Sequence, residues 1–493
     1  MDDADHASSR VARAKSRSVF VAALALLVAG CSGIGDKAST AQATLIVPPS
    51  APRTTGGESA AVREHKQLVA YFGGEYRAPA TERYLDDVLS KLANASDTPT
   101  QAYKVTILNS PIVNAFALPS GNIYVTRGLL ALANDTSEVA AVMAHEIAHV
   151  TARHALQRAE LEKRSALISQ AADVIENRDR GKTFKAYAQL SLASFSRQQE
   201  LEADQIGVHV IAKAGYDPFA ASRFLVSLGK STELRQMTHS GAGKPDMMAT
   251  HPSTPERVAA AIAVARGIGA PGLGDTAQDK YLASIEGLLY GDDPAEGFVR
   301  GRKFVHPKLG FSFTAPANFV LENSAQAVLG VTEDGNEALR LDRVKVPMET
   351  SLQSYLASGW IDGLQPSTAV AVTVNGLQGV TATARAETWS FRLAAIRVGG
   401  EVYRLTFASK TFSDDIDRQF REAIETFRRI TPEEARDVKS ARIGVVTAAP
   451  GDTADLMANR MAVPDHPLET FRVLNSLDST GVQPGRRYKL IGE

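Results

Sequence analysis

Residues 138–150 form the stretch that most constrains this chain, with the sequence Glu-Val-Ala-Ala-Val-Met-Ala-His-Glu-Ile-Ala-His-Val. The stretch lacks Gly and Pro and is rich in Ala, so it predicts a helix. Three polar residues can cap its start, namely Asp135, Thr136 and Ser137. Because side chains four residues apart share one helix face, His145 and His149 can point at a common metal ion.

Glu146 lies about 100° around the predicted helix from His145. This offset places its carboxylate beside a metal ion without making it a ligand, so that it can take a proton from a water molecule. The order His-Glu-x-x-His therefore indicates a zinc site suited to hydrolysis. The alternative, a surface helix with two solvated histidines, conflicts with the apolar character of the neighbouring residues.

A zinc site of this kind needs a third protein ligand and one open position for water. The chain has one cysteine among its 493 residues, which excludes a cysteine-rich zinc site and a disulfide framework. The third ligand must therefore be a histidine or a carboxylate. A histidine six residues after His149 would serve, but that position holds Ala155. His154 is out of register, and we expect it on the helix surface.

Residues 197–207 form a second predicted helix with three acidic side chains. Glu200 and Asp204 share one face, whereas Glu202 points some 200° away from Glu200. With Glu200 on the metal, Asp204 can bind the far ring nitrogen of either zinc-site histidine and fix its tautomer. With Glu202 on the metal, Ile206 would hold the supporting position and could accept nothing. We therefore predict Glu200 as the third ligand, and the alternative is an ordinary acidic helix face.

A strand at residues 104–108 and a hairpin at 113–126 precede the zinc helix. An exposed edge of such a sheet can pair with an extended peptide through backbone hydrogen bonds and hold it across the metal. The candidate substrate-binding residues on this edge are Asn114, Ala115 and Phe116. The alternative is that the hairpin is only scaffold.

The chain begins with the features of an export signal. Basic residues precede an apolar run at residues 19–29, which is too short to span a bilayer stably. Residues 28–31 resemble the bacterial lipobox, which implies cleavage before Cys31 and lipidation of that cysteine. A buried apolar helix is the alternative. Ser32 follows Cys31, and the lack of an Asp at this position leads us to expect the outer membrane. Residues 31–63 lack periodicity, which predicts a flexible tether.

Three motifs together resemble the HtpX and CaaX-prenyl-protease family of gluzincins, namely residues 145–149, 200–204 and 114–121. The resemblance covers roughly residues 64–267 and is closer to the soluble periplasmic branch than to the members that span membranes. It implies one zinc ion per chain, general acid–base catalysis and support of the ligands from a further carboxylate. The implied roles are zinc ligands for His145, His149 and Glu200, general base for Glu146 and support for Asp204.

Residues 250–257 match the family's His-Pro motif with a following arginine, which makes His251 and Arg257 active-site candidates. Either side chain could stabilise the oxyanion that forms as water adds to a peptide carbonyl. In the soluble relatives the histidine can instead cover the metal and hold the enzyme latent. The sequence leaves this choice open, and without the family match His251 would count as a loop residue.

The second half of the chain shows no further group of metal ligands in its sequence. From residue 301 apolar and polar residues alternate, and a helix at 414–430 carries an apolar side that would pack on the resulting sheet. Residues 441–492 follow the order strand, Gly-Asp-Thr turn, two short helices and strand, which resembles a LysM module. The resemblance implies binding to the N-acetylglucosamine backbone of peptidoglycan. A LysM-like fold used only for packing is the alternative.

We therefore predict a multidomain α+β protein. A mainly helical zincin-type peptidase domain with a small β-sheet is followed by an α+β domain and a βααβ module. The expected boundaries are a signal peptide at 1–30, a tether at 31–63, the peptidase at 64–270, a linker at 271–299, the α+β domain at 300–432 and the LysM-like module at 441–492.

The resemblance implies an exported, lipid-anchored zinc metalloendopeptidase at the periplasmic face of the cell envelope, with misfolded or stalled envelope proteins as substrates. We also expect contact with peptidoglycan through the C-terminal module. A net charge of -1, from 54 Lys and Arg against 55 Asp and Glu, gives no general attraction to nucleic acid. Two other functions are a peptidoglycan-associated scaffold or chaperone with structural zinc, and a murein hydrolase.

Overall fold

The computed structural model describes residues 59–160, 195–237, 247–323, 327–386, 388–477 and 481–493. The predicted signal peptide, the lipidation site at Cys31 and nearly all of the tether lie outside the described residues. Within the described ranges, no helix combines the length and the hydropathy needed to span a bilayer.

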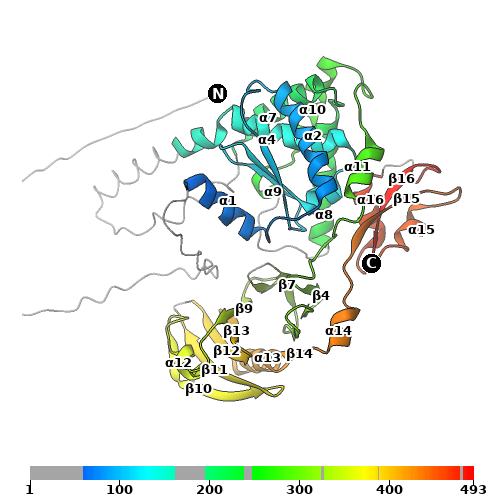
Figure 1. Cartoon of the computed structure of the whole chain (residues 1–493). Coiled ribbons are helices and arrows are strands. Elements are labelled where there is room, and N and C mark those ends of the chain that lie inside the picture. Colours follow the sequence, from blue (N-terminus) through cyan, green and yellow to red (C-terminus); the bar gives the residue numbers. More distant parts are fainter. Residues whose placement is uncertain (1–58, 161–194, 238–246, 324–326, 387, 478–480) are drawn as a thin grey trace, which may run out of the picture. The chain divides into compact units, whose positions relative to one another are not determined.

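The part of the chain that precedes residue 290 is mainly helical and contains one small sheet (Figure 1). Its helices are α1 (Ala60–Tyr71), α2 (Pro79–Ala95), α3 (Arg127–Leu132), α4 (Thr136–Thr151), α7 (Arg197–Lys213), α8 (Ala220–Met237), α9 (Met247–Thr250), α10 (Pro255–Ile268) and α11 (Gln278–Ile285). Its strands are β1 (Lys104–Leu108), β2 (Ala115–Ala117) and β3 (Asn122–Thr126).

Helix α4 is the core element of this part, because its residues are buried from the first one to His149. A helix that is apolar nearly all round must be covered on every side, and α2, α7 and α8 all contact it. Asp135 caps its start by accepting the N–H of Glu138 at 2.9 Å. Helix α7 approaches α4 closely at Gly207, where a Cβ would lie 3.2 Å from the backbone nitrogen of His145.

The small sheet has the strand order β1-β3-β2. β1 pairs parallel with β3, whereas β2 pairs antiparallel with β3 to form the expected hairpin. The turn of this hairpin uses Gly121 at φ 89°, a conformation that glycine adopts without strain. β2 is therefore an edge strand, and it contacts α4.

Two antiparallel sheets form the next part of the chain. The strands are β4 (Phe298–Arg300), β5 (Lys303–His306), β6 (Phe311–Thr314), β7 (Phe319–Asn323), β8 (Val328–Thr332), β9 (Glu337–Lys345), β10 (Leu364–Val374), β11 (Leu377–Arg385), β12 (Ser390–Val398), β13 (Glu401–Ser409) and β14 (Arg428–Arg429). The helices are α12 (Leu352–Leu356), α13 (Asp414–Glu425) and α14 (Pro432–Asp437).

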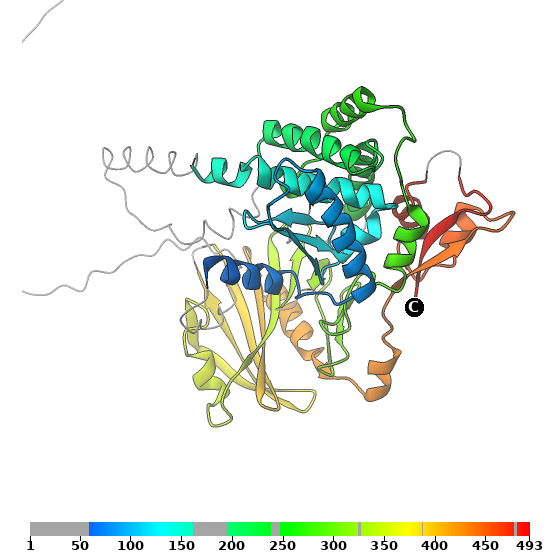
Figure 2. The same cartoon turned by 45° about the horizontal axis from the view of Figure 1, so that its top comes forward.

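The larger sheet has seven strands in the order β10-β11-β12-β13-β9-β8-β7, and the smaller has four in the order β14-β6-β5-β4. Alternate residues of β12 face opposite sides of the sheet. Ala394 and Ile396 pack with α13, and Leu393 and Ala395 pack with α12. Figure 2 shows these two helices on opposite sides of the larger sheet. The helix that we predicted at 414–430 is shorter, because the chain leaves α13 to pair β14 with β6.

The last part contains β15 (Arg442–Thr447), α15 (Ala454–Ala458), α16 (Pro467–Leu474) and β16 (Arg487–Gly492), and its two strands pair antiparallel. This is the expected βααβ order, although its identity as a LysM module stays a prediction. Phe471, Tyr488 and Ile491 belong to the same hydrophobic cluster as Leu130 and Val139. The C-terminal module therefore shares its core with the elements around α4.

Candidate metal centre

Three elements bring four buried side chains together. His145 and His149 come from α4, Glu200 from the first turn of α7, and His251 from the residue after α9. The Nε2 atoms of His145 and His149 lie 3.0 Å apart, and each lies 3.5 Å from a carboxylate oxygen of Glu200. His251 Nδ1 lies 3.3 Å from His145 Nε2 and 3.0 Å from Glu200 Oε1.

These separations fit a bound metal ion. Four ligand atoms at about 2.0–2.1 Å from a tetrahedral zinc ion lie about 3.3 Å from one another, and the observed distances run from 3.0 to 3.5 Å. A proton can bridge only two of these atoms, whereas a metal cation between them satisfies all four. Three imidazole nitrogens and one carboxylate are also a set of ligands that zinc accepts. The residues present therefore fit zinc.

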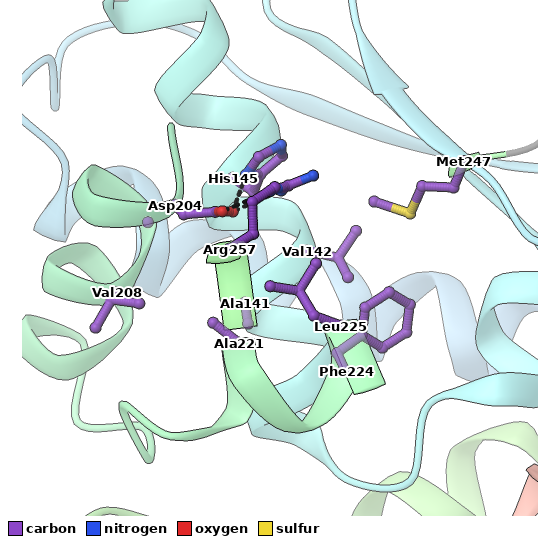
Figure 3. Close-up of a pocket in the computed structure, with 11 residues that line it drawn as sticks. Ala141, Val142, His145, Asp204, Val208, Ala221, Phe224, Leu225, Met247 and Arg257 are labelled. Atoms are coloured by element: carbon purple, nitrogen blue, oxygen red, sulfur yellow. Dashed lines mark hydrogen bonds and ion pairs between the residues drawn. The ribbon is translucent and has the colours of Figure 1, made fainter. Parts of the chain in front are cut away.

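Asp204 and Arg257 contact two members of this cluster, His145 and Glu200, and Figure 3 shows Asp204 with His145 and Arg257. Asp204 Oδ1 lies 3.0 Å from His145 Nδ1, so His145 is the histidine that Asp204 orients. Arg257 donates to both oxygens of Asp204 at 2.7 Å, and its Nη1 lies 2.8 Å from Glu200 Oε2 and 2.9 Å from the carbonyl of Pro252. Because these contacts use Nε and both amino groups, Arg257 is placed to clamp two carboxylates. This differs from the oxyanion role that the sequence left open for Arg257.

The buried charges shift pKa values in both directions. Burial lowers the pKa of His145, but hydrogen bonds to Asp204 and Glu200 outweigh burial and raise the pKa to about 10. Burial and the neighbouring charges of His145 and His251 hold the pKa of His149 well below its usual value. Burial alone would raise the pKa of Glu200, yet the same two histidines lower it. The site thus favours positive charge beside its carboxylates, and zinc can supply that charge when it displaces the proton.

Glu146 is buried beside this cluster and is not one of its four members. Within the described part of the chain, its Oε1 has no hydrogen-bond partner, and His251 Nε2 lies 3.7 Å away. Burial raises the pKa of Glu146, although the charges on His251 and His145 oppose this shift. A buried carboxylate oxygen without a partner indicates a position for water or for a substrate group. A raised pKa also suits a residue that accepts and returns a proton.

His154 lies in the interior, so our prediction of a surface position is wrong. Helix α4 ends at Thr151, and Arg153 adopts a left-handed conformation with φ 55°. This turn brings His154 back to His149, where the two Nδ1 atoms lie 2.9 Å apart. The residues of the turn, Ala152 and Arg153, both favour helix, so the sequence carries no signal for this break.

The candidate substrate residues lie on and next to β2. Asn114, Ala115 and Phe116 are all buried, and the ring of Phe116 stacks on Tyr124 with the centroids 4.8 Å apart. These side chains therefore belong to the core. Only the backbone of the strand remains as a candidate edge for a bound peptide.

Residues 79–265 match Peptidase family M48. Curated relatives include the Beta-barrel assembly-enhancing protease of Escherichia coli (strain K12), 28% identical over 253 residues that cover 48% of this chain and 50% of that protein. The protein of the same name from Yersinia pestis is 26% identical over 374 residues, which cover 64% of this chain and 74% of that protein. The Mitochondrial metalloendopeptidase OMA1 of Arabidopsis thaliana is 36% identical over 156 residues, which cover 32% of this chain and 30% of that protein.

The chain spans about half the length of the Escherichia coli relative. The segment that matches the family contains α4, α7 and the His-Pro motif, and these elements contribute the four clustered side chains. These matches confirm the metallopeptidase family that the motifs predict. Residues 79–265 therefore form a domain of peptidase family M48, a family of zinc metallopeptidases.

Proposed function

We propose that the chain is a zinc metalloendopeptidase that hydrolyses peptide bonds in proteins of the bacterial cell envelope. The main observation in support is the cluster at α4, where four ligand atoms are spaced as a metal ion requires. Beside them lies the buried carboxylate of Glu146, whose Oε1 lacks a hydrogen-bond partner among the described residues. The family match and the names of the relatives support the same chemistry.

A zinc ion held by His145, His149 and Glu200 would supply the positive charge that makes an attacking water acidic near neutral pH. Glu146 accepts the proton of that water and passes it to the leaving amine nitrogen. Burial raises the pKa of Glu146 in the metal-free protein, which makes its carboxylate a stronger base for the first transfer. Arg257 meanwhile holds Glu200 in position through the contact between its Nη1 and Glu200 Oε2.

We assign His251 to the latent role rather than to oxyanion stabilisation. Its Nδ1 lies 3.3 Å from His145 Nε2 and 3.0 Å from Glu200 Oε1, so with zinc bound His251 would occupy the position that a catalytic zinc site keeps open for water. Helix α9, which precedes His251, lies beside the start of strand β2. The N–H of Met247 donates to the carbonyl of Val113 at 3.0 Å. His251 would therefore have to move away before water could reach a bound zinc ion.

The outer edge of β2 is the proposed site for a substrate peptide. The carbonyl of Asn114 and the N–H of Leu118 both bond inward to the β3 side of the hairpin. The alternate residues Ala115 and Ala117 therefore direct their backbone groups to the outer edge. Pairing through backbone groups places few demands on substrate side chains, which suits a protease that acts on many unfolded chains.

We further propose that lipidated Cys31 anchors the protein at the periplasmic face of the outer membrane. Unfolded or misassembled envelope proteins would be its substrates, in line with the Escherichia coli relative that is named for β-barrel assembly. The sequence resemblance supports peptidoglycan binding by the βααβ module. The membership of Tyr488 in the cluster around α4 supports the alternative that the module serves as part of the core.

Cleavage of unfolded casein by the chain without its first 31 residues tests this function. We expect slow cleavage that a zinc chelator abolishes and added zinc restores, and faster cleavage by the His251→Ala variant. Zinc-loaded protein that leaves casein intact in both forms would favour a scaffold with structural zinc. Release of muropeptides from purified sacculi would favour a murein hydrolase.

A further inference from the structure

His154 and Glu202 take no part in the proposed chemistry. Successive side-chain contacts nevertheless connect Glu202 to His154 and His154 to His149. His154 Nδ1 lies 2.9 Å from His149 Nδ1, and His154 Nε2 lies 3.4 Å from Glu202 Oε2. The His154 side chain is fully buried. Its two ring nitrogens therefore meet protein atoms and not bulk water.

The backbone brings the two rings together. On an uninterrupted helix, His154 would lie about 140° around the axis from His149. The helix instead ends at Thr151, and Arg153 takes φ 55°, which residues with a side chain seldom adopt. Gln199 of α7 also reaches this turn, with its Nε2 3.5 Å from the carbonyl of His154. An unfavourable backbone conformation of this kind next to an active site is typical of a functional constraint.

The positions of the ring protons on His149 and His154 follow from zinc binding by His149. To bind zinc through Nε2, His149 must be neutral and carry its proton on Nδ1. That N–H faces the Nδ1 of His154, which must therefore accept it. His154 then carries its own proton on Nε2, where it points at the carboxylate of Glu202. The three groups thus have one consistent arrangement of hydrogen bonds.

The other histidine on α4 shows what such support does. His145 Nδ1 meets the carboxylate of Asp204 directly at 3.0 Å. For His149 the corresponding carboxylate is that of Glu202, which contacts His154 and not His149 itself. Phe195 covers a face of the His149 ring, with the two centroids 3.9 Å apart and the planes 20° apart. Partners that orient a metal-bound histidine are typically worth about 10–100-fold in metal affinity.

We propose that His154, oriented by Glu202, is a positioning residue that fixes the tautomer of His149 and aims its Nε2 at the metal. The proposal rests on the zinc site of the proposed function. The proposal gives a role to each of the three acidic residues near the start of α7. Glu200 binds the metal, Asp204 supports His145, and Glu202 supports His149 through His154.

Zinc affinity of purified variants, measured by competition with a chelating dye, tests the proposal. His154→Leu keeps the bulk but removes the acceptor, so we expect about 10–100-fold weaker zinc binding. His154→Asn keeps an acceptor oxygen near the position of Nδ1 and should stay within about threefold of the wild type. His209→Leu is the matched control, because His209 is exposed on α7 and, among the described residues, bonds only to its own helix through the carbonyl of Gln205. Wild-type affinity in His154→Leu would overturn the proposal.

Nitrogen NMR of the zinc-loaded wild type, labelled at histidine, tests the tautomers without any substitution. We expect the proton on Nδ1 of His149 and on Nε2 of His154. A proton on Nδ1 of His154 would overturn the proposal, even if the Leu variant failed to fold. A protein that binds zinc with these tautomers but cleaves no casein would refute the proposed peptidase and leave the role of His154 standing. A wild type that binds no zinc would refute both.

Discussion

The two ends of α4 carry buried charged clusters of different kinds. At its N-terminal end, Arg223 contacts the carboxylates of Asp135, Asp217 and Glu138. Lys489, from the last strand, donates to three backbone carbonyls at and just beyond the end of α3. At the other end of α4, the nitrogens of three histidines and the oxygens of Glu200 face one another.

The difference lies in whether the atoms of a cluster satisfy each other. In the first cluster each cation has acceptors, and burial is tolerated because the charges are paired. In the second, lone pairs converge on one point, and a metal cation is what would pair them. We conclude that the cluster with Lys489 serves stability, whereas the cluster with Glu200 serves binding.

Replacing Lys489 by Met should have the largest effect on stability. Three carbonyls lose their donor, and the buried carboxylate of Glu138 loses a nearby cation. We expect the free energy of unfolding in urea to fall by about 3–5 kcal/mol. Lys439→Met removes an exposed ion pair with Glu493 and should change stability by about 0.5 kcal/mol or less. A Lys489 variant as stable as this control would show that the cluster with Lys489 does not serve stability.

Zinc should stabilise the protein only while the second cluster is intact. At a hundredfold excess over its Kd, zinc raises the free energy of unfolding by about 2.7 kcal/mol. We expect this gain for the wild type and for Lys489→Met, but not for His149→Asn. Thermal unfolding with and without zinc measures it. An equal gain in His149→Asn would mean that zinc binds elsewhere.

The metal-free protein should lose stability as the pH rises from neutral to 10. The pKa of His145 is raised from 6.5 to about 10 in the folded protein, so its proton stabilises the fold fully below pH 6.5. That contribution is lost as the pH rises through about 10. Melting temperatures of chelator-treated protein should therefore fall over this window, less so for zinc-loaded protein and for His145→Asn. If the melting temperatures of all three proteins fell equally with pH, His145 would not be the cause of the fall.

Ser476→Ala should have the smallest effect. Its Oγ accepts a hydrogen bond from Asn134 Nδ2 at 2.8 Å and meets Ser227 Oγ at 2.8 Å, which ties the C-terminal module to the helices near the first cluster. Loss of these bonds should cost about 1 kcal/mol in urea unfolding. The exposed Ser367 on β10 provides a control, since its replacement by Ala should change nothing measurable.

Features set by local periodicity could be predicted from the sequence. The spacing of His145 and His149 requires only a helix, and the choice of Glu200 over Glu202 requires only that Asp204 share its face. Features set by tertiary packing could not. Lys489 alternates along β16 with Tyr488 and Leu490, a pattern that places a lysine in solvent, and its burial depends on carbonyls more than 350 residues away in the chain.

His251 lies between these cases, because only the resemblance to a known family marked it as part of the site. Nothing in the residues around it predicts a position at the fourth corner of the cluster. The turn at Arg153 had no signal at all, since a helix former adopts a left-handed conformation there. For this reason the sequence suggested a surface position for His154.

Comparison of Glu146→Gln with the wild type at equal zinc content tests whether Glu146 is the general base of a zinc peptidase. Casein cleavage and bound zinc are measured on the same preparations. We predict one zinc ion per chain in both proteins and cleavage at least roughly 100-fold slower in the variant, because the proton acceptor is gone. A variant that cleaves as fast as the wild type would exclude Glu146 as the proton acceptor. A wild type that cleaves without bound zinc would exclude a zinc peptidase.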